Sequence, residues 1–259
     1  MKVAVIGSGI SGLACAYYLH RDHEVHVLER DRRVGGHTAT VDVALGGRRY
    51  AVDTGFIVFN DWTYPNFIAL MDELGVSSKP SNMSFSLSDA ASGLEYAGSG
   101  LNSLFAQRRN LIRPTFLGML RDILRFNRES VEDLENGRIP ADETLGQYLE
   151  RKRLGRAFRA DYLVPMGSAI WSADESVMLD FPLQFFVRFF RNHGLLSMRN
   201  RPQWRTVVGG SYSYVKSFTK SFKGQLHLSS PVRTIRRQEK EVLLTLDDGT
   251  GFGCDQVVI

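Results

Sequence analysis

The chain has 259 residues with 43% hydrophobic and 23% charged side chains and a formal net charge of +4, a composition typical of a globular protein rather than a disordered or fibrous one. It contains no run of 18 apolar residues, so we predict no transmembrane helix. Cys15 and Cys254 show no metal or redox spacing, and the first strand leaves no room for a signal peptide, so we expect a cytoplasmic protein without a metal site.

Residues 3–19 are predicted to form a β-strand, a glycine turn and the start of a helix. Their sequence is VAVIGSGISGLACAYYL, and the turn has the G-x-G-x-x-G spacing. In this motif the first glycine permits a sharp turn, the second lets a pyrophosphate approach the backbone, and the third lets the helix pack close to the strand. The N-terminus of the helix offers N–H groups and a positive dipole end to the phosphates.

A second apolar strand, residues 25–28, ends at Glu29. A carboxylate at this position can accept hydrogen bonds from a ribose diol, so the order of elements predicts dinucleotide binding. The motif alone does not separate NAD from FAD. The histidines around this strand, His20, His23 and His26, are predicted to be surface residues.

Two further glycine segments follow. RDRRVGGHTATV contains Arg33, Gly35 and Gly36, and YAVDTGFIVFN contains Asp53 and Gly55. These segments resemble the superfamily of FAD-dependent amine oxidases, protoporphyrinogen oxidases and phytoene desaturases. In that superfamily an R-x-G-G-R/H-x-x-T segment wraps the pyrophosphate, and a D-x-G segment lies beside the flavin.

The resemblance implies FAD as the cofactor. It implies the following cofactor-binding residues: Gly7, Ser8, Gly9, Ile10, Ser11, Gly12, Glu29, Arg30, Gly35, Gly36, His37, Thr38, Gly55, Phe56 and Val232. His37 stands where many amine oxidases have arginine, which donates more hydrogen bonds to phosphate than a neutral histidine does. We still expect His37 to contact the pyrophosphate or the flavin.

The middle of the chain is predicted to be mostly helical. Three elements are predicted before it. The first is a hairpin of residues 41–45 and 48–53 with its turn at Gly46 and Gly47. The second is a helix capped by Thr63 and ended by Gly75, and the third is a hairpin of residues 84–87 and 94–96. Residues 101–190 then have helical patterns, with predicted breaks at Pro114, Pro140, Pro165 and Pro182.

The last part of the chain returns to the nucleotide-binding domain. Residues 206–210 are predicted to end a strand, 211–222 to form a helix and 225–228 a third parallel strand, and a β-meander opens at residues 231–235. The resemblance implies that the backbone of Val232 meets the adenine, although packing in the meander explains this valine equally well. Residues 256–259 are predicted to form a buried strand.

These elements predict an α/β fold. A Rossmann-like FAD-binding domain with a β-meander would comprise residues 1–80 and 205–259, and an inserted, mostly helical substrate domain would comprise residues 81–204. Because members of the superfamily continue beyond the position of Ile259, we expect this chain to be C-terminally truncated.

Two segments, residues 107–128 and 188–205, mix arginines with large apolar side chains. Such segments can lie on an anionic membrane or face a lipid-like substrate, or they can be ordinary solvated helices with a core stripe. No recognition motif accompanies the charge, so we expect no nucleic-acid partner. The oligomeric state stays open.

The segments DTGFIVFN, TYPNFIALMDELGV and PMGSAIWS resemble a narrower bacterial branch of NAD/FAD-binding, amine-oxidase-like proteins, whose genes often neighbour enzymes similar to cyclopropane-fatty-acid synthases. This resemblance implies an FAD-dependent oxidoreductase that removes a hydride equivalent from a hydrophobic, for example fatty-acyl, substrate. The alternatives are an FAD-dependent amine oxidase, a non-catalytic nucleotide-binding fragment, and an NAD-linked dehydrogenase, which the Gly35 and Asp53 segments disfavour.

No catalytic residue is identified. Asn60 and Trp171 are candidate residues of a substrate pocket, with packing as the alternative role of each.

Overall fold

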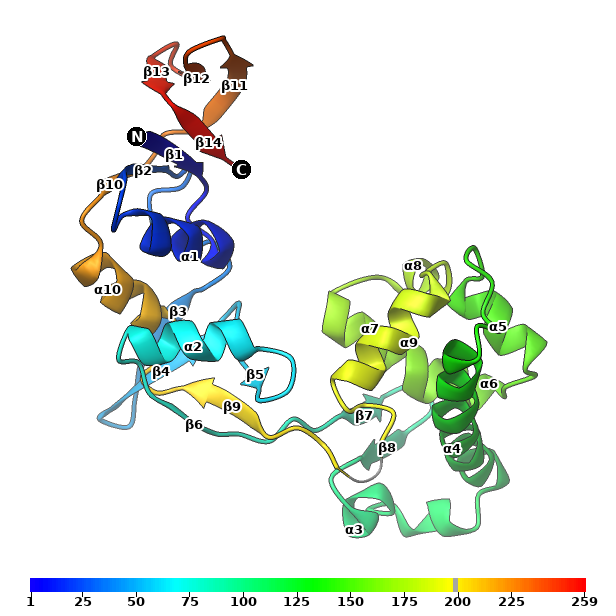
Figure 1. The fold of residues 1–259 in the computed structure, drawn as a ribbon. Helices are drawn as coiled ribbons and strands as arrows, with labels where there is room; N and C mark the ends of the chain where they lie inside the picture. Colours follow the sequence, from blue (N-terminus) through cyan, green and yellow to red (C-terminus); the bar gives the residue numbers. More distant parts are fainter. Residues whose placement is uncertain (198–199) are drawn as a thin grey trace. The chain divides into compact units, whose positions relative to one another are not determined.

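The computed structural model describes residues 1–197 and 200–259 (Figure 1). The chain divides into two compact units, one formed by Met1–Ser81 with Trp204–Ile259 and the other by Asn82–Gln203. Met198 and Arg199, in the predicted basic segment 188–205, lie outside the described residues. The roles of the units in binding FAD and substrate stay predictions.

The first unit contains a parallel sheet of four strands in the order β10-β2-β1-β14. These strands are Gln225–His227, Glu24–Leu28, Lys2–Ile6 and Gln256–Val258. Figure 1 shows the first and the last strand of the chain side by side, because β1 pairs in parallel with β14. The strands predicted at residues 3–6, 25–28 and 225–228 are confirmed.

Successive side chains of a strand point to opposite faces of the sheet, and a different set of elements packs on each face. Val5, Val25 and Val27 pack in the cluster that holds buried residues of helices α1 (Ile10–Leu19), α2 (Pro65–Glu73) and α10 (Tyr212–Ser221). Ala4 and Leu28 pack against the antiparallel meander β11 (Val232–Arg237), β12 (Val242–Leu246) and β13 (Gly251–Cys254). The helix and the meander predicted in this part of the chain are confirmed.

Two smaller sheets complete the first unit. The predicted hairpin is confirmed as β3 (Thr40–Leu45) and β4 (Arg48–Asp53), joined at Gly46 and Gly47. Strands β5 (Phe59–Asn60), β9 (Trp204–Val207) and β6 (Ser78–Pro80) form an antiparallel sheet in the order β5-β9-β6.

The second unit begins with the hairpin β7 (Ser86–Asp89) and β8 (Leu94–Ala97) and is otherwise mainly helical. The short helices α3 and η1 are followed by the long helix α4. In the described part of the unit, five further α-helices and the π-helical turn η2 follow. Their bounds are α3 Leu101–Leu104, η1 Arg108–Leu111, α4 Pro114–Glu135, α5 Leu145–Arg151, α6 Arg156–Phe158, η2 Arg159–Leu163, α7 Val164–Trp171, α8 Glu175–Leu179 and α9 Leu183–Asn192. Fully buried aromatic side chains, among them Phe126, Phe158 and Phe186, form its core.

The predicted break at Pro165 is wrong. Pro165 lies in the first turn of α7, which continues directly from η2. Proline lacks the N–H group that would bond to the carbonyl of Asp161 four residues earlier. The hydroxyl of Tyr96 donates to that carbonyl instead, at 2.6 Å, so the helix passes the proline with this oxygen satisfied.

The predicted helix cap at Thr63 is also wrong. Helix α2 starts after Tyr64 with a proline in its first turn and no capping side chain. The hydroxyl of Thr63 instead donates to Oδ1 of Asn60 at 3.1 Å.

Two burial predictions are wrong. None of residues 256–259 is fully buried, because β14 pairs only with β1 among the described strands. Val257 and Val258 are partly buried, and Ile259 is 84% exposed. His26, predicted at the surface, is only 4% exposed. Strand alternation places His26 on the face of Leu28, beneath the meander, where its ring centroid lies 5.1 Å from that of Phe252.

Candidate nucleotide-binding site

The glycine turn has the geometry of a phosphate cradle. Gly7 has a φ of +91°, and its N–H donates to the carbonyl of Leu28 at 2.8 Å, which directs the chain sharply out of β1. A Cβ atom at Gly12 would collide with the carbonyl oxygen of Gly7, so only glycine permits this packing of helix and strand. A Cβ at Gly9 would meet open space, so the backbone at Gly9 is accessible to a ligand.

Helix α1 opens toward this space. Gly9 is its N-cap and supplies no capping side chain, and the first turn, which includes Ile10 and Ser11, has no acidic residue. The first N–H groups of the helix and the positive end of its dipole are therefore offered to an anion.

Glu29 is fixed directly beside the turn. Its Oε2 accepts hydrogen bonds from the backbone N–H of Ser8, at 2.7 Å, and from the Ser8 hydroxyl, and its Oε1 accepts from the N–H of Asp31 at 2.8 Å. Burial alone would raise the pKa of the Glu29 carboxyl, but these hydrogen bonds outweigh burial and hold its pKa below the usual range. Each carboxylate oxygen has two lone pairs, so Glu29 retains capacity to accept from a ribose.

The second glycine segment lies directly against the first. The N–H of Gly35 donates to the carbonyl oxygen of Ser8 at 3.0 Å and to its hydroxyl at 3.1 Å. A Cβ at Gly36 would lie only 2.9 Å from Cα of Gly9. Ser8 therefore links Glu29 to the Gly35 segment, and the two glycine segments form one continuous backbone surface.

Arg33 shapes the loop that carries His37 and Thr38. Its guanidinium donates to the carbonyl oxygens of Thr38 and Gly36, both at 2.7 Å. Thr38 is buried, and its hydroxyl hydrogen-bonds to that of Tyr214 on α10. Arg33 was not predicted as a site residue, although its place in the R-x-G-G motif could have indicated it. The hydrogen bond between Thr38 and Tyr214 was not predicted either.

The D-x-G segment joins the hairpin to α10. Oδ1 of Asp53 accepts from the hydroxyl of Thr40 at 2.6 Å, and from the N–H and hydroxyl of Ser211 at 2.8 and 2.9 Å. A Cβ at Gly55 would collide with the carbonyl oxygen of His37. The motif thus holds the residues after β4 against the loop of the second glycine segment.

The remaining predicted cofactor-binding residues lie around this centre. Arg30 and His37 are exposed, and Phe56 is half-buried with its ring centroid 5.3 Å from that of Phe67. Val232 starts β11 just after Ser230, whose N–H donates to the carbonyl of Glu29 at 2.8 Å. The meander therefore begins at the strand end that carries Glu29.

The structure shows local contacts for both candidate pocket residues. Asn60 is fully buried, and its Oδ1 accepts from the N–H groups of Trp62 and Thr63 at 3.0 and 2.9 Å, which fixes the turn before α2. Trp171 belongs to the other unit, where its ring centroid lies 4.8 Å from those of Phe181 and Phe189. Lining of a substrate pocket by Asn60 or Trp171 stays a prediction.

The residues present fit a bound dinucleotide. Open space at Gly9, an uncapped helix N-terminus and an anchored carboxylate at the end of β2 offer contacts to pyrophosphate and ribose. Within the part of the chain that the structure describes, no group of three or more His, Cys, Asp or Glu side chains gathers as a metal site would.

This fold and this cradle define a dinucleotide-binding protein of the Rossmann class. Residues 10–259 match the model of the flavin containing amine oxidoreductases, and the chain belongs to this family. Its cofactor is therefore FAD, and the predicted oxidoreductase superfamily is confirmed. No curated protein matches the sequence.

Solved structures with similar folds share little sequence with the chain. Cyclohexylamine oxidase from Brevibacterium oxydans is 21% identical to this chain, with a TM-score of 0.76. The match covers 100% of this chain and 57% of the oxidase chain. An engineered putrescine oxidase is 20% identical with a TM-score of 0.69 and the same coverage. A protein provisionally assigned as a protoporphyrinogen oxidase, from Exiguobacterium sp., is 22% identical with a TM-score of 0.65, covering 99% and 58%.

These likenesses support the fold, and the chain spans somewhat more than half the length of the three proteins. Among the helices of the described residues, none combines the length and the apolar character needed to cross a bilayer.

Proposed function

We propose that this chain provides the FAD-binding part of an oxidoreductase that removes a hydride equivalent from a hydrophobic, lipid-like substrate. The FAD-binding part of the proposal rests on the contact network that joins Glu29, Ser8 and Gly35 beside the open backbone of Gly9. The lipid-like substrate rests on the resemblance of the DTGFIVFN, TYPNFIALMDELGV and PMGSAIWS segments to the narrower bacterial branch. FAD supplies the redox chemistry, since its ring accepts the hydride equivalent. The residues of this chain bind and orient it.

Each part of the cradle has a role in this proposal. Glu29 accepts from the ribose hydroxyls, and the N-terminus of α1 with Gly9 holds the pyrophosphate. His37, Gly55 and Phe56 lie on loops that would face the flavin, and the backbone of Val232 would meet the adenine. Arg33 and Asp53 do not need to touch the cofactor, because their hydrogen bonds fix the loops that do.

A second candidate is an FAD-dependent amine oxidase. The family name and the cyclohexylamine and putrescine oxidases among the structural neighbours favour it. Anaerobic mixing with amines or with fatty-acyl compounds, followed by the loss of visible flavin absorption, separates the two candidates. A third candidate is a nucleotide-binding fragment without activity, which predicts bound flavin that neither class of compound reduces.

The binding step is tested by replacing Glu29 with glutamine. Glu29→Gln keeps the shape but removes the charge that strengthens the hydrogen bonds, so we expect FAD affinity to fall about tenfold or more. Flavin fluorescence quenching during titration measures the affinity. Glu239→Gln, a surface change between β11 and β12, is the control. Equal affinity of the two variants would contradict the assigned role of Glu29.

We further propose that this protein is cytoplasmic and contacts anionic membranes through the first of its two basic segments, residues 107–128. Within this segment Leu111 is 51% exposed and Ile112 83% exposed, beside the exposed Arg108 and Arg109. The sequence has no acidic residue between positions 96 and 121. Exposed apolar side chains next to arginines suit the interface of an anionic bilayer.

The second basic segment is less suited to this role. Leu183, Phe186 and Phe190 of α9 are fully buried in the core of their unit, and Arg191 pairs with Glu135 at 2.6 Å. Helix α9 is therefore better described by the alternative interpretation, in which one apolar face of the helix packs in the core and the other face is solvated.

Vesicle co-sedimentation tests the membrane contact. We expect binding to vesicles with phosphatidylserine, and we expect it to weaken with added salt. The combined Arg108→Gln and Arg109→Gln variant should bind about thirtyfold more weakly, since each of the two basic residues near such a surface contributes about 1 kcal/mol. Lys216→Gln combined with Lys220→Gln on α10 is the control. Binding to neutral vesicles that equals binding to anionic ones would contradict the proposal.

A further inference from the structure

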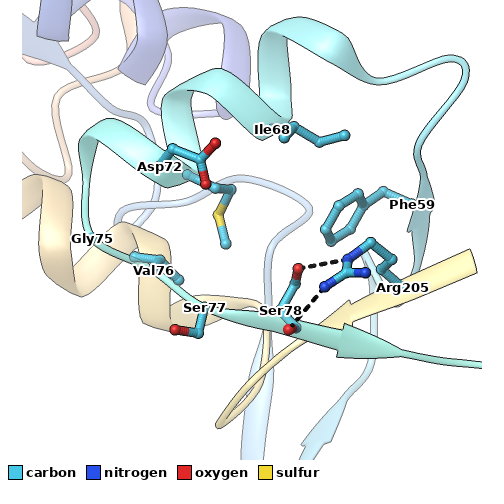
Figure 2. A pocket seen from close by; sticks show the side chains of 9 residues that line it. Phe59, Ile68, Asp72, Gly75, Val76, Ser77, Ser78 and Arg205 are labelled. Carbon is cyan, nitrogen blue, oxygen red and sulfur yellow. Dashed lines mark hydrogen bonds between the residues drawn. The ribbon is translucent and has the colours of Figure 1, made fainter.

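A separate cavity of about 440 Å³ lies in the first unit, between α2 and the strands β6 and β9 (Figure 2). Its volume falls in the range of small-molecule sites, roughly 300–1,000 Å³. None of the predicted cofactor-binding residues lines it. The cavity is therefore distinct from the glycine cradle.

One side of the cavity carries a half-buried cation. Nε of Arg205 donates to the hydroxyl of Ser78 at 2.8 Å, and Nη2 donates to the carbonyl oxygen of Ser78 at 3.1 Å. Figure 2 shows these two bonds holding the guanidinium beside Phe59. Neither bond uses Nη1, and among residues 1–197 and 200–259 no carboxylate lies within ion-pair distance of Arg205.

A charge held in this way favours an anionic ligand. Ser78 supplies neutral acceptors only, so the charge of Arg205 is solvated but not neutralised by the protein. A guanidinium with donors to spare binds carboxylates with good geometry, and its attraction strengthens where water is partly excluded.

The remaining lining combines apolar side chains with the polar residues Asp72 and Ser77. Phe59 is 1% exposed and Met71 is 3% exposed, and Ile68 and Val76 also line the space. Asp72 lines it as well but is exposed, and Figure 2 shows it apart from Arg205. The negative charge of Asp72 disfavours an anion at its own end, so the anionic group of a ligand is directed to Arg205.

We propose that this cavity is a binding site for an aliphatic carboxylate. The carboxylate is held by Arg205, and the hydrocarbon chain lies against Phe59, Ile68 and Met71. The site requires both parts of the ligand, since Arg205 recognises the charge and the apolar walls bury the chain. It does not depend on the proposed redox activity.

Calorimetric titration of the purified protein with octanoate tests the site. We expect saturable binding of one octanoate, at least about tenfold weaker binding of octanol, which lacks the charge, and of acetate, which lacks the chain. Arg205→Gln should weaken octanoate binding about tenfold or more, and Arg205→Lys should weaken it less. Arg236→Gln, an exposed arginine on β11, is the control and should change nothing.

A second variant separates loss of the site from loss of the fold. Ile68→Trp fills the cavity from α2 and leaves the Arg205–Ser78 bonds in place, so it should abolish octanoate binding while circular dichroism and flavin affinity stay as in the parent. Octanol that binds as well as octanoate, or octanoate binding unchanged by Arg205→Gln or by Ile68→Trp, would overturn the proposal.

Discussion

Gly36 and Gly46 have nearly the same positive φ angle in different surroundings. Their φ values are +56° and +58°. A Cβ at Gly36 would lie 2.9 Å from Cα of Gly9, whereas a Cβ at Gly46 would meet nothing within 4 Å. Alanine at either position costs about 1 kcal/mol of conformational strain. Only Gly36→Ala also pushes the two glycine segments apart.

We therefore expect Gly36→Ala to lower FAD affinity at least about tenfold, whereas Gly46→Ala keeps it, since about 1.4 kcal/mol corresponds to a factor of ten. Both variants should lose a similar small amount of stability from strain, with a further loss in Gly36→Ala. Flavin titration and urea unfolding measure these effects. Equal FAD affinity in the two variants would show that contact between Gly36 and Gly9 does not shape the site.

Single residues also show what sequence reasoning could reach. Gly7, Gly12 and Gly36 were predictable because the motif spacing reflects local backbone geometry. The bond between Asp53 and Ser211 was not, because the two residues are 158 positions apart and only the tertiary fold brings them together. The role of Asn60 in a substrate pocket stays a prediction, and the turn that its Oδ1 closes by accepting from Trp62 and Thr63 was not predicted from its sequence position.

Neighbouring strands β2 and β10 carry a pair of histidines beneath the meander. Nδ1 of His26 lies 3.0 Å from Nε2 of His227, and Nε2 of His26 lies 2.9 Å from Glu24. Lys2 on β1 faces the same region, with its Nζ 4.2 Å from the ring centroid of Phe252. Burial lowers the pKa of His227, and His26 and Lys2 lower it further.

This arrangement predicts loss of stability in mild acid. Because the pKa of His227 is lower in the folded state, the unfolded state binds the proton more readily. The contribution to stability is complete above the unfolded pKa, about 6.5, and is lost as the pH falls below it. We expect the free energy of unfolding to decrease from pH 8 to pH 5.5, and His227→Gln to reduce that decrease.

Urea unfolding at several pH values measures this effect, with the exposed His37→Gln as the control. If the free energy of unfolding of His227→Gln changes with pH as it does in the parent and in the control, the histidine pair is not the cause of the lost stability in acid. Strand alternation, applied to residues 24–28, places His26 on the buried face, but only the covering meander shows that this face is enclosed.

Helices α7 and α9 show which features of a helix can be predicted from the spacing of its apolar residues. The apolar spacing of α9 predicted a helix and was right, because its stripe faces one core. The break at Pro165 was wrong because the hydroxyl of Tyr96 replaces the lost hydrogen bond from a distant hairpin. Periodicity reports which face is buried, whereas helix ends depend on single contacts that the local sequence does not contain.

At the scale of the whole molecule, the cradle and the chain of hydrogen bonds around it lie within a single unit. Gly9, Glu29, Gly36, Asp53 and Ser211 all belong to Met1–Ser81 with Trp204–Ile259. A ligand that binds only the folded cradle stabilises the unit that contains it. We therefore propose that FAD protects this unit and leaves the helical core of Asn82–Gln203 unchanged.

Hydrogen exchange with and without FAD measures that protection. Slower exchange is expected in β1, α1, β2 and α10, because opening any of them would release the bound cofactor. The backbone amides of α4 and α9 should exchange at the same rate in both states, since their core is built from residues of their own unit. Equal slowing in α4 and α9 would mean that the units respond as one body. The assignment of FAD binding to the first unit alone would then fail, and the segment 82–203 would have to carry part of the cofactor site.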